Sequence, residues 1–452
     1  MHRWSPADEP LVSITRAVAL ALPAALLCAA FVSEAGAQRA AAAGVLARTP
    51  ASATVADTTD ALEVDLLTVG QGDQVWEKFG HNSIVITDRR AGTSVAWNWG
   101  VFDFNQPNFI GRFLSGNTLY RMDGYPTDAS IAFYQSLNRT AWIQRLALNA
   151  HYKRRLRDLI LENARPGNRE YRYEYFLDNC STRIRNLLNE ATGGGLAGWT
   201  RYHFGGDSYL SHTQRLVADN PFTEIGVTIA LGLRADSTLT MWDEMFVPMK
   251  LQQRVRELMV EDGRGGIRPL VASERTLFTA TRAAELVRPP RIWPWCLAIA
   301  LVLGGLILAL ARATTRGSRQ AQVALAAVGA TWLTLAGIVG LILILAATLT
   351  RHVYWQDNPS AWLLSAAGLA SAAAFAHVVM RPHAGIAWRL VAALASLLSF
   401  VGVWQLMSHG AEPRVGVIAL VMPVHMALLL VLVQLRRPRA ARAGGAGPAA
   451  TA

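Results

Sequence analysis

The stretch FLDNCSTRIRNLL, residues 176–188, predicts the start of a helix that carries a cysteine in its first turn. After Cys180, the apolar residues Ile184, Leu187 and Leu188 recur at helical spacing until the glycines at 193–195 end the pattern. A helix dipole lowers the pKa of a thiol at its N-terminal end and favours the reactive thiolate. A buried cysteine that only packs in the core is nevertheless the commoner case. The rest of the sequence has to decide between a reactive and a packing cysteine.

Five apolar segments follow residue 290, at about 293–311, 323–350, 361–380, 385–407 and 415–435. Each is close to or above the roughly 20 residues that cross a bilayer, so residues 291–436 are predicted to form a transmembrane domain of five helices. Arginines gather after the first, third and fifth segments, whereas the other two loops hold only Arg351 and Arg414. The positive-inside rule therefore places residues 437–452 in the cytoplasm and residues 38–290 outside it.

The N-terminal residues 1–37 have the order of a secretory signal peptide: two arginines, an apolar run from Ala17 to Phe31, and Ala35-Gly36-Ala37. A retained membrane anchor is the alternative. Residues 38–58, rich in Ala and Thr, are predicted to form a linker. This organisation predicts a multi-pass membrane protein with an exported domain, for which nucleic acid is an improbable partner despite the net charge of +11.

The exported region, 59–290, is predicted to be an α+β domain with a small antiparallel sheet, about the size of one papain-like core. Strands are expected at 63–69, 81–88, 93–100 and 140–148, an extended aromatic run at 170–176, and helices at about 127–137 and 150–164. A basic cluster runs from Arg139 to Arg165. This cluster is either a solvated helix face or a surface that attracts anionic lipid headgroups, and the sequence does not decide between these two interpretations.

Within this domain Cys180 is the only cysteine, because Cys28 lies in the signal peptide and Cys296 in the first apolar segment. A lone cysteine in an oxidising compartment has no structural disulfide to make, which favours a catalytic role. Four histidines could supply the base. Of these, His151 lies on a charged helix and His203 and His212 look like surface or loop residues, so His81, at the start of a strand, is preferred.

A polar partner for His81 follows from the predicted hairpin. If the chain turns near Arg90-Ala91, the numbers of two residues that face each other across the hairpin add up to about 181. Asn98 then lies across from Ser83, beside His81. Asn98 could hold the imidazole in its productive tautomer, as the third group of a triad. Ser181 is a conceivable alternative nucleophile. No His-Glu-x-x-His or paired-cysteine spacing is present, so no metal is predicted, and no cofactor is expected.

The motifs FGHNSIVI (79–86), WNWGVFDF (97–104) and GNREYRYEYFLDNCSTR (167–183), with five C-terminal spans, resemble the bacterial lipoprotein N-acyltransferase family called Lnb. The resemblance implies a multi-pass protein of the bacterial inner membrane with its catalytic domain in the periplasm. That domain would be permuted papain-like (NlpC-type), with Cys180 as nucleophile and His81 as base. The flanking residues are expected to support the nucleophile: Asp178, Asn179, Ser181 and Arg183.

The implied reaction moves an acyl chain from a membrane phospholipid to the α-amino group of a diacylated lipoprotein, through a thioester on the cysteine. The lipid bilayer, the phospholipid donor and the lipoprotein acceptor are the expected partners. Two other functions stay open from the residues alone. One is an exported, membrane-anchored cysteine amidase or peptidase with the same dyad, and the other is a membrane sensor without enzymatic activity.

Overall fold

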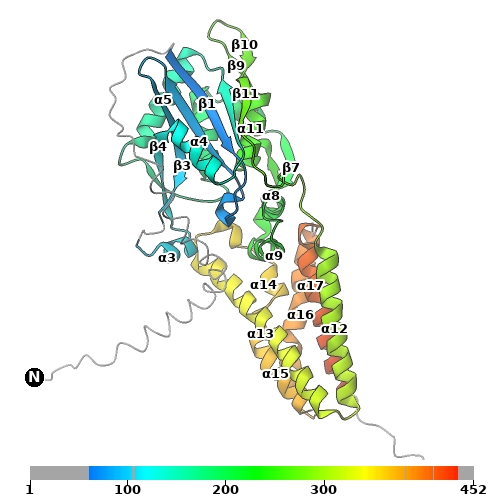
Figure 1. The fold of residues 1–452 in the computed structure, drawn as a ribbon. Coiled ribbons are helices and arrows are strands. Elements are labelled where there is room, and N and C mark those ends of the chain that lie inside the picture. Colours follow the sequence, from blue (N-terminus) through cyan, green and yellow to red (C-terminus); the bar gives the residue numbers. More distant parts are fainter. Residues whose placement is uncertain (1–60, 104–106, 382, 411, 436–452) are drawn as a thin grey trace, which may run out of the picture.

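The computed structural model describes residues 61–103, 107–381, 383–410 and 412–435. An α+β domain stands on a bundle of long helices (Figure 1). The predicted signal peptide (1–37), the linker (38–58) and the tail (437–452) lie outside the described residues.

The described part of the domain contains a seven-stranded sheet in which every neighbouring pair is antiparallel. Its order is β11-β5-β1-β2-β3-β4-β6. The strands are β1 (Leu62–Val69), β2 (His81–Asp88), β3 (Thr93–Val101), β4 (Leu119–Pro126), β5 (Ala141–Leu146), β6 (Glu170–Arg172) and β11 (Val271–Phe278). Two smaller pairs join β7 (Phe204–Ser208) to β8 (Thr238–Thr240) and β9 (Met259–Glu261) to β10 (Ile267–Pro269).

The β2–β3 hairpin has the register predicted from the sequence, since Ser83 pairs with Asn98 and Ile84 with Trp97. The aromatic run 170–176 is strand only over Glu170–Arg172. After it the chain turns back on itself through a bridge between Glu174 and Asp178, which ends the extended segment early.

Helices cover both faces of the sheet, because the central strands carry apolar side chains on each face. Val64, Leu66 and Ile84 pack against α5 (Ala150–Ala164) and α6 (Cys180–Ala191) in one core. Val69, Val85 and Ala96 face the opposite way, against α4 (Thr127–Ser136). The other helices of the domain are α3 (Phe109–Leu114), α7 (Gly195–Thr200), α8 (Tyr209–Leu216), α9 (Pro221–Ala230), α10 (Met241–Glu244) and α11 (Pro248–Glu257), with short 3-10 turns at Val75–Glu77 and Leu233–Asp236.

Five helical segments of the described chain are long and apolar enough to span a membrane. They are α12 (Trp293–Thr315), α13 (Arg319–Leu349), Ser360–Met380, α16 (Ile386–Ser408) and α17 (Val415–Gln434). The third is interrupted and consists of α14 (Ser360–Leu363) and α15 (Gly368–Met380). Short 3-10 turns precede α14 and α17, at Val353–Trp355 and Glu412–Arg414.

The arginine-rich loop between α12 and α13 lies at the end of the bundle away from the domain. The opposite end of α13 leads into Arg351, whose N–H donates to the carbonyl of Ser115 beside α3. The domain and the arginines therefore lie on opposite sides of the predicted membrane, as the positive-inside rule requires.

Polar contacts fix the domain to the bundle. The buried Arg414 donates to both carboxylate oxygens of Asp236, at 2.9 Å each, and to the carbonyls of Thr228, Leu231 and Gly232. In the α13–α14 loop, Tyr354 packs edge-on against Phe176, four residues before Cys180, with ring centroids 4.9 Å apart. The bundle thus contributes to the core behind the candidate nucleophile.

Candidate active site

Helix α6 begins at Cys180 because Asn179 caps it. Asn179 Oδ1 accepts the Thr182 N–H at 2.9 Å, and Thr182 Oγ1 accepts the Asn179 N–H at 2.8 Å, which makes a reciprocal capping box. The Asn179 amide nitrogen also donates to the carbonyls of Tyr175 and Phe246. These contacts fix both the start of the helix and the direction from which the chain reaches Cys180.

The other residues flanking Cys180 hold the helix in place and are committed to partners. Ser181 is fully buried and donates to the Met245 carbonyl at 2.6 Å, which argues against its acting as an alternative nucleophile. Asp178 accepts two hydrogen bonds from Arg183. The Arg183 guanidinium in turn lies 4.1 Å from the centroid of the Tyr171 ring.

His81 and Asn98 contact each other across the hairpin. His81 Nε2 lies 2.9 Å from Asn98 Oδ1, which also accepts the Ser83 hydroxyl, while Asn98 Nδ2 donates to the Ala96 carbonyl. Because Oδ1 only accepts, the proton of a neutral His81 belongs on Nε2. The other ring nitrogen, Nδ1, is then the one that can take a proton from a nucleophile.

The start of α6 lies against the ends of these strands. The backbone N–H of Asn82, the residue after His81, is close enough to Cys180 to lower the pKa of its thiol. On the neighbouring strand, a Cβ added at Gly100 would lie 3.8 Å from the Cβ of Cys180. Cys180, His81 and Asn98 are therefore brought to one end of the hairpin by the β2–β3 register and the α6 cap.

Burial favours the neutral forms of the Cys180 thiol and the His81 imidazole. Burial raises the pKa of the Cys180 thiol, and the N–H groups of Asn82 and Ser181 and the charge of Arg139 offset only part of this. The lowered pKa expected from the helix dipole alone is therefore wrong. Burial also lowers the pKa of His81 to about 4, with Arg139 acting in the same direction and Asn98 against it. A neutral thiol and a neutral imidazole are compatible with proton transfer during a reaction, and not with a preformed thiolate–imidazolium pair.

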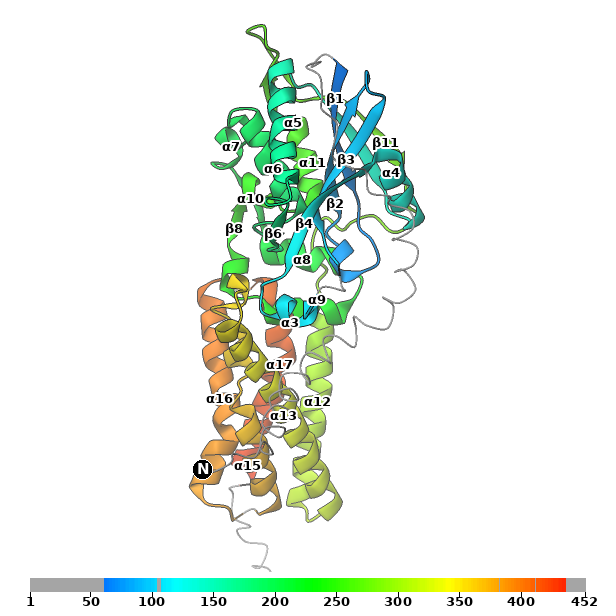
Figure 2. The same cartoon turned by 90° about the vertical axis from the view of Figure 1, so that its left-hand side faces the viewer.

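Sequence reasoning missed Arg139, which it placed in the basic cluster. The side chain is buried, donates from Nε to the Gly70 carbonyl at 3.0 Å, and lies 3.7 Å from a Glu77 carboxylate oxygen. Its Nη2 has no hydrogen-bond partner in the part of the chain that the structure describes. The rest of the cluster lies mainly on α5, at the end of the domain away from the bundle (Figure 2), which fits a solvated face and not headgroup binding.

Tyr171 is a second residue that the sequence analysis passed over. Its hydroxyl is buried and unpaired within the described residues, and it lies 3.9 Å from the point where Gly100 would carry a Cβ, beside Cys180. Burial and the nearby Cys180 raise its pKa well above the usual value, so the hydroxyl keeps its proton. The alternation of tyrosines in EYRYEYF was the available signal, since it predicts that Tyr171 and Tyr173 share one side of the chain.

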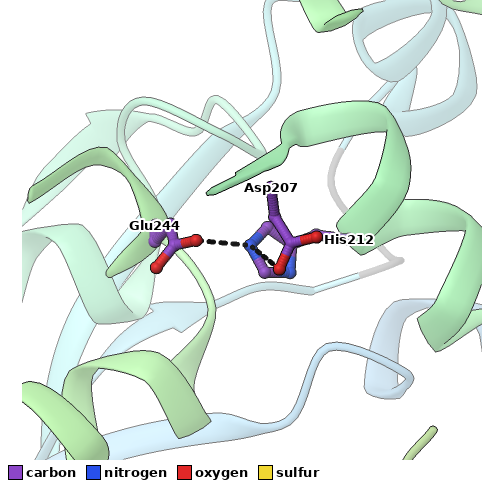
Figure 3. A group of neighbouring side chains, drawn as sticks. All are labelled: Asp207, His212 and Glu244. Carbon is purple, nitrogen blue, oxygen red and sulfur yellow. Dashed lines mark ion pairs between the residues drawn. The ribbon is translucent and has the colours of Figure 1, made fainter. Parts of the chain in front are cut away.

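The sequence suggested that His212 lies on the surface or in a loop. This prediction is wrong, because the side chain is fully buried on α8. Dashed lines in Figure 3 join its ring to Glu244 and Asp207, and Nε2 lies 3.6 Å from the Glu244 carboxylate and 3.9 Å from that of Asp207. Because Nδ1 accepts from Arg215 at 3.0 Å, Nε2 carries the proton of the neutral ring and is not free to bind a metal.

Cations already neutralise these carboxylates. Lys250 lies 3.3 Å and Arg254 3.2 Å from Glu244. Burial opposes ionisation of Glu244, but the neighbouring His212 and the charge of Lys250 lower the pKa of this carboxyl group to about 2. We interpret the group as an internal ion-pair cluster that positions Met245 and Phe246, whose carbonyls hold the start of α6. His151 and His203 are exposed, as expected.

Comparison with known proteins gives one match. Residues 48–206, about a third of the chain, match the family model of the Lnb N-terminal periplasmic domain. The match contains His81, Asn98 and Cys180. No curated protein and no solved structure matches the chain, so the papain-like, NlpC-type comparison stays a prediction. Residues 48–206 are therefore similar to the periplasmic domain of the Lnb family, and five helices long and apolar enough to span a membrane follow them in the described chain.

Proposed function

We propose that this protein is a lipoprotein N-acyltransferase of the inner membrane. It moves an acyl chain from a membrane phospholipid to the α-amino group of a lipoprotein's diacylglyceryl-cysteine, through a thioester on Cys180. The observation that carries the proposal is that a capped, helix-start cysteine and a histidine with a fixed tautomer lie at the same end of the β2–β3 hairpin, in a region that matches the Lnb periplasmic domain.

In the first half-reaction, Cys180 Sγ attacks the ester carbonyl of the lipid while His81 Nδ1 takes the thiol proton. The carbonyl oxygen becomes an oxyanion, which the Cys180 N–H and the unpaired Tyr171 hydroxyl are suited to hold. The carbon–oxygen bond then breaks, and the leaving alkoxide takes the proton from His81. The products are acyl-Cys180 and a lysophospholipid.

In the second half-reaction, the lipoprotein amine attacks the thioester and loses a proton to His81. Cleavage of the carbon–sulfur bond releases the amide product, and the Cys180 thiolate recovers its proton from His81. A covalent intermediate suits two bulky substrates that need not be bound together.

Attachment to the membrane favours acyl transfer over the amidase and sensor alternatives. Arg414 and Tyr354, from two loops of the bundle, fix the domain at one end of the five spans. Both proposed substrates are held in the bilayer by their acyl chains, so this position raises their effective concentration at the site. A soluble peptide substrate would gain nothing from it.

The test is mass spectrometry of one lipoprotein N-terminus after reaction with purified protein in phospholipid liposomes. Wild type should add one acyl group and show the same acyl mass on Cys180, and Cys180→Ser should do neither. Acyl transfer by the serine variant would contradict the cysteine mechanism. Acyl-Cys180 that is lost to water, with no acylated lipoprotein, would indicate a hydrolase instead.

A further inference from the structure

Helix α3 lies where the domain meets the bundle (Figures 1 and 2). The carbonyl of Phe113, in its last turn, is 3.0 Å from Nε2 of His352, in the loop that follows the span α13. The side chains of Ile110 and Phe113 are about half exposed, at 53% and 47%. Exposed apolar residues at the membrane end of a domain favour contact with lipid.

A row of near-parallel aromatic rings leads away from α3. Phe113 stacks on Phe109, with centroids 6.3 Å apart, and Phe109 on Phe102, at 6.1 Å. Phe102 stacks on Tyr120 at 4.9 Å, and Tyr120 on Tyr173 at 4.2 Å. The planes of successive rings differ by only 17–22°. We call these five residues the aromatic row.

The aromatic row ends at the nucleophile. A Cβ added at Gly100 would lie 4.0 Å from Cε2 of Tyr173 and 3.8 Å from the Cβ of Cys180, so both border the same small space. Gly100 has φ +89°, a conformation that side chains disfavour, and its lack of a side chain leaves that space open. Phe113 is exposed, Tyr120 is buried, and the other three residues of the row are half-buried.

We propose that the aromatic row binds the fatty acyl chain of the donor lipid between the bilayer and Cys180. An ester carbonyl that reaches the nucleophile draws its chain out of the membrane, and exposing methylene groups to water is unfavourable. The half-buried rings of the row place apolar atoms along that path, from α3 to Cys180. This inference rests on the proposed acyl transfer, and it assigns the chain, not the headgroup, to these rings.

Chain-length preference provides the test. Phe102→Ala and Phe109→Ala, in the full-length protein, should each lower the ratio of Cys180 acylation by a palmitoyl donor to that by a butyryl donor about tenfold. The matched control is Phe222→Ala, an exposed phenylalanine on α9, which also lies at the membrane end but outside the row. An unchanged ratio in both variants would overturn the inference, as would an equal drop in the control.

A second readout does not depend on catalysis. The Cys180→Ser variant, in liposomes carrying a phospholipid with a photoreactive diazirine in one palmitoyl chain, should crosslink at residues of the aromatic row. Crosslinks confined to the membrane helices would overturn the inference. If wild type forms no acyl-Cys180 but the row still crosslinks, acyl transfer fails while the lipid site stands.

Discussion

His81 Nε2 lies 2.9 Å from Asn98 Oδ1, and the Asn98 amide cannot turn over without losing its bonds to the Ser83 hydroxyl and the Ala96 carbonyl. The orientation of the imidazole is thus set by backbone pairing, since Ser83 and Asn98 face each other in the β2–β3 register. Two strands with a fixed register hold the ring more tightly than a loop would.

Replacing Asn98 should therefore weaken catalysis without removing it. Asn98→Ala should slow acyl-Cys180 formation about tenfold, through misorientation of His81, whereas His81→Ala should slow it by roughly 10²–10⁴. Ser83→Ala is the control, because it leaves the bond between Asn98 and His81 in place. The measurement is single-turnover labelling of Cys180 by a lipid donor. Wild-type rates in Asn98→Ala would rule out the orienting role.

The pH dependence of the reaction should reflect burial of the imidazole. Because burial lowers the pKa of His81 to about 4, the base is neutral at any higher pH, and the acid limb of acylation should fall near pH 4. Burial also raises the pKa of Cys180, so difference absorbance between wild type and Cys180→Ser should show no thiolate at pH 7. An acid limb near the ordinary histidine pKa of about 6.5 would contradict this account.

Removing the Tyr171 hydroxyl tests its role as an oxyanion donor. Tyr171→Phe should slow thioester formation by roughly 10²-fold, because loss of one donor from an oxyanion site typically costs that much. Tyr175→Phe is a closely matched control, since its hydroxyl is also buried without a partner among the described residues. Equal effects of the two changes would point to packing and not to catalysis.

The sequence predicted the parts of the site that depend on local patterns. The period of two in residues 81–88 and 93–100, with a turn between them, gave the hairpin register and so the pairing of His81 with Asn98. The polar residue before Cys180 and the helical spacing after it gave the start of α6. Both signals come from neighbours in the chain.

Groups placed by tertiary contacts could not be predicted in this way. Arg139 reads as part of a basic run, yet its side chain is buried beside Gly70, 69 residues away. His212 reads as a loop residue, and only the fold surrounds it with Glu244 and Asp207. The raised pKa of Cys180 likewise depends on burial, which the helix-dipole argument does not include.

The ion pair between Arg414 and Asp236 predicts that docking of the domain on the membrane helices speeds acylation of the lipoprotein. A fragment cut near residue 290 would lose Tyr354, which packs against Phe176 in the domain. The effect of loosening the domain from the bundle is therefore better tested in the full chain. Arg414→Met together with Asp236→Asn removes the ion pair without leaving a buried charge unpaired, and it also removes the bonds to three carbonyls.

This double variant should label at Cys180 with a small thiol reagent at the wild-type rate, because the dyad and its sheet lie entirely within the domain. It should acylate a bilayer-embedded lipoprotein at least about tenfold more slowly, since a loosely held domain loses the effective concentration that docking supplies. Arg351→Met, an exposed arginine at the same end of the bundle, is the control. Both reactions are compared in the same liposomes. Equal rates of lipoprotein acylation by the double variant and wild type would mean that the five spans serve only as a tether. Slower labelling of Cys180 by the thiol reagent would mean that docking shapes the active site itself.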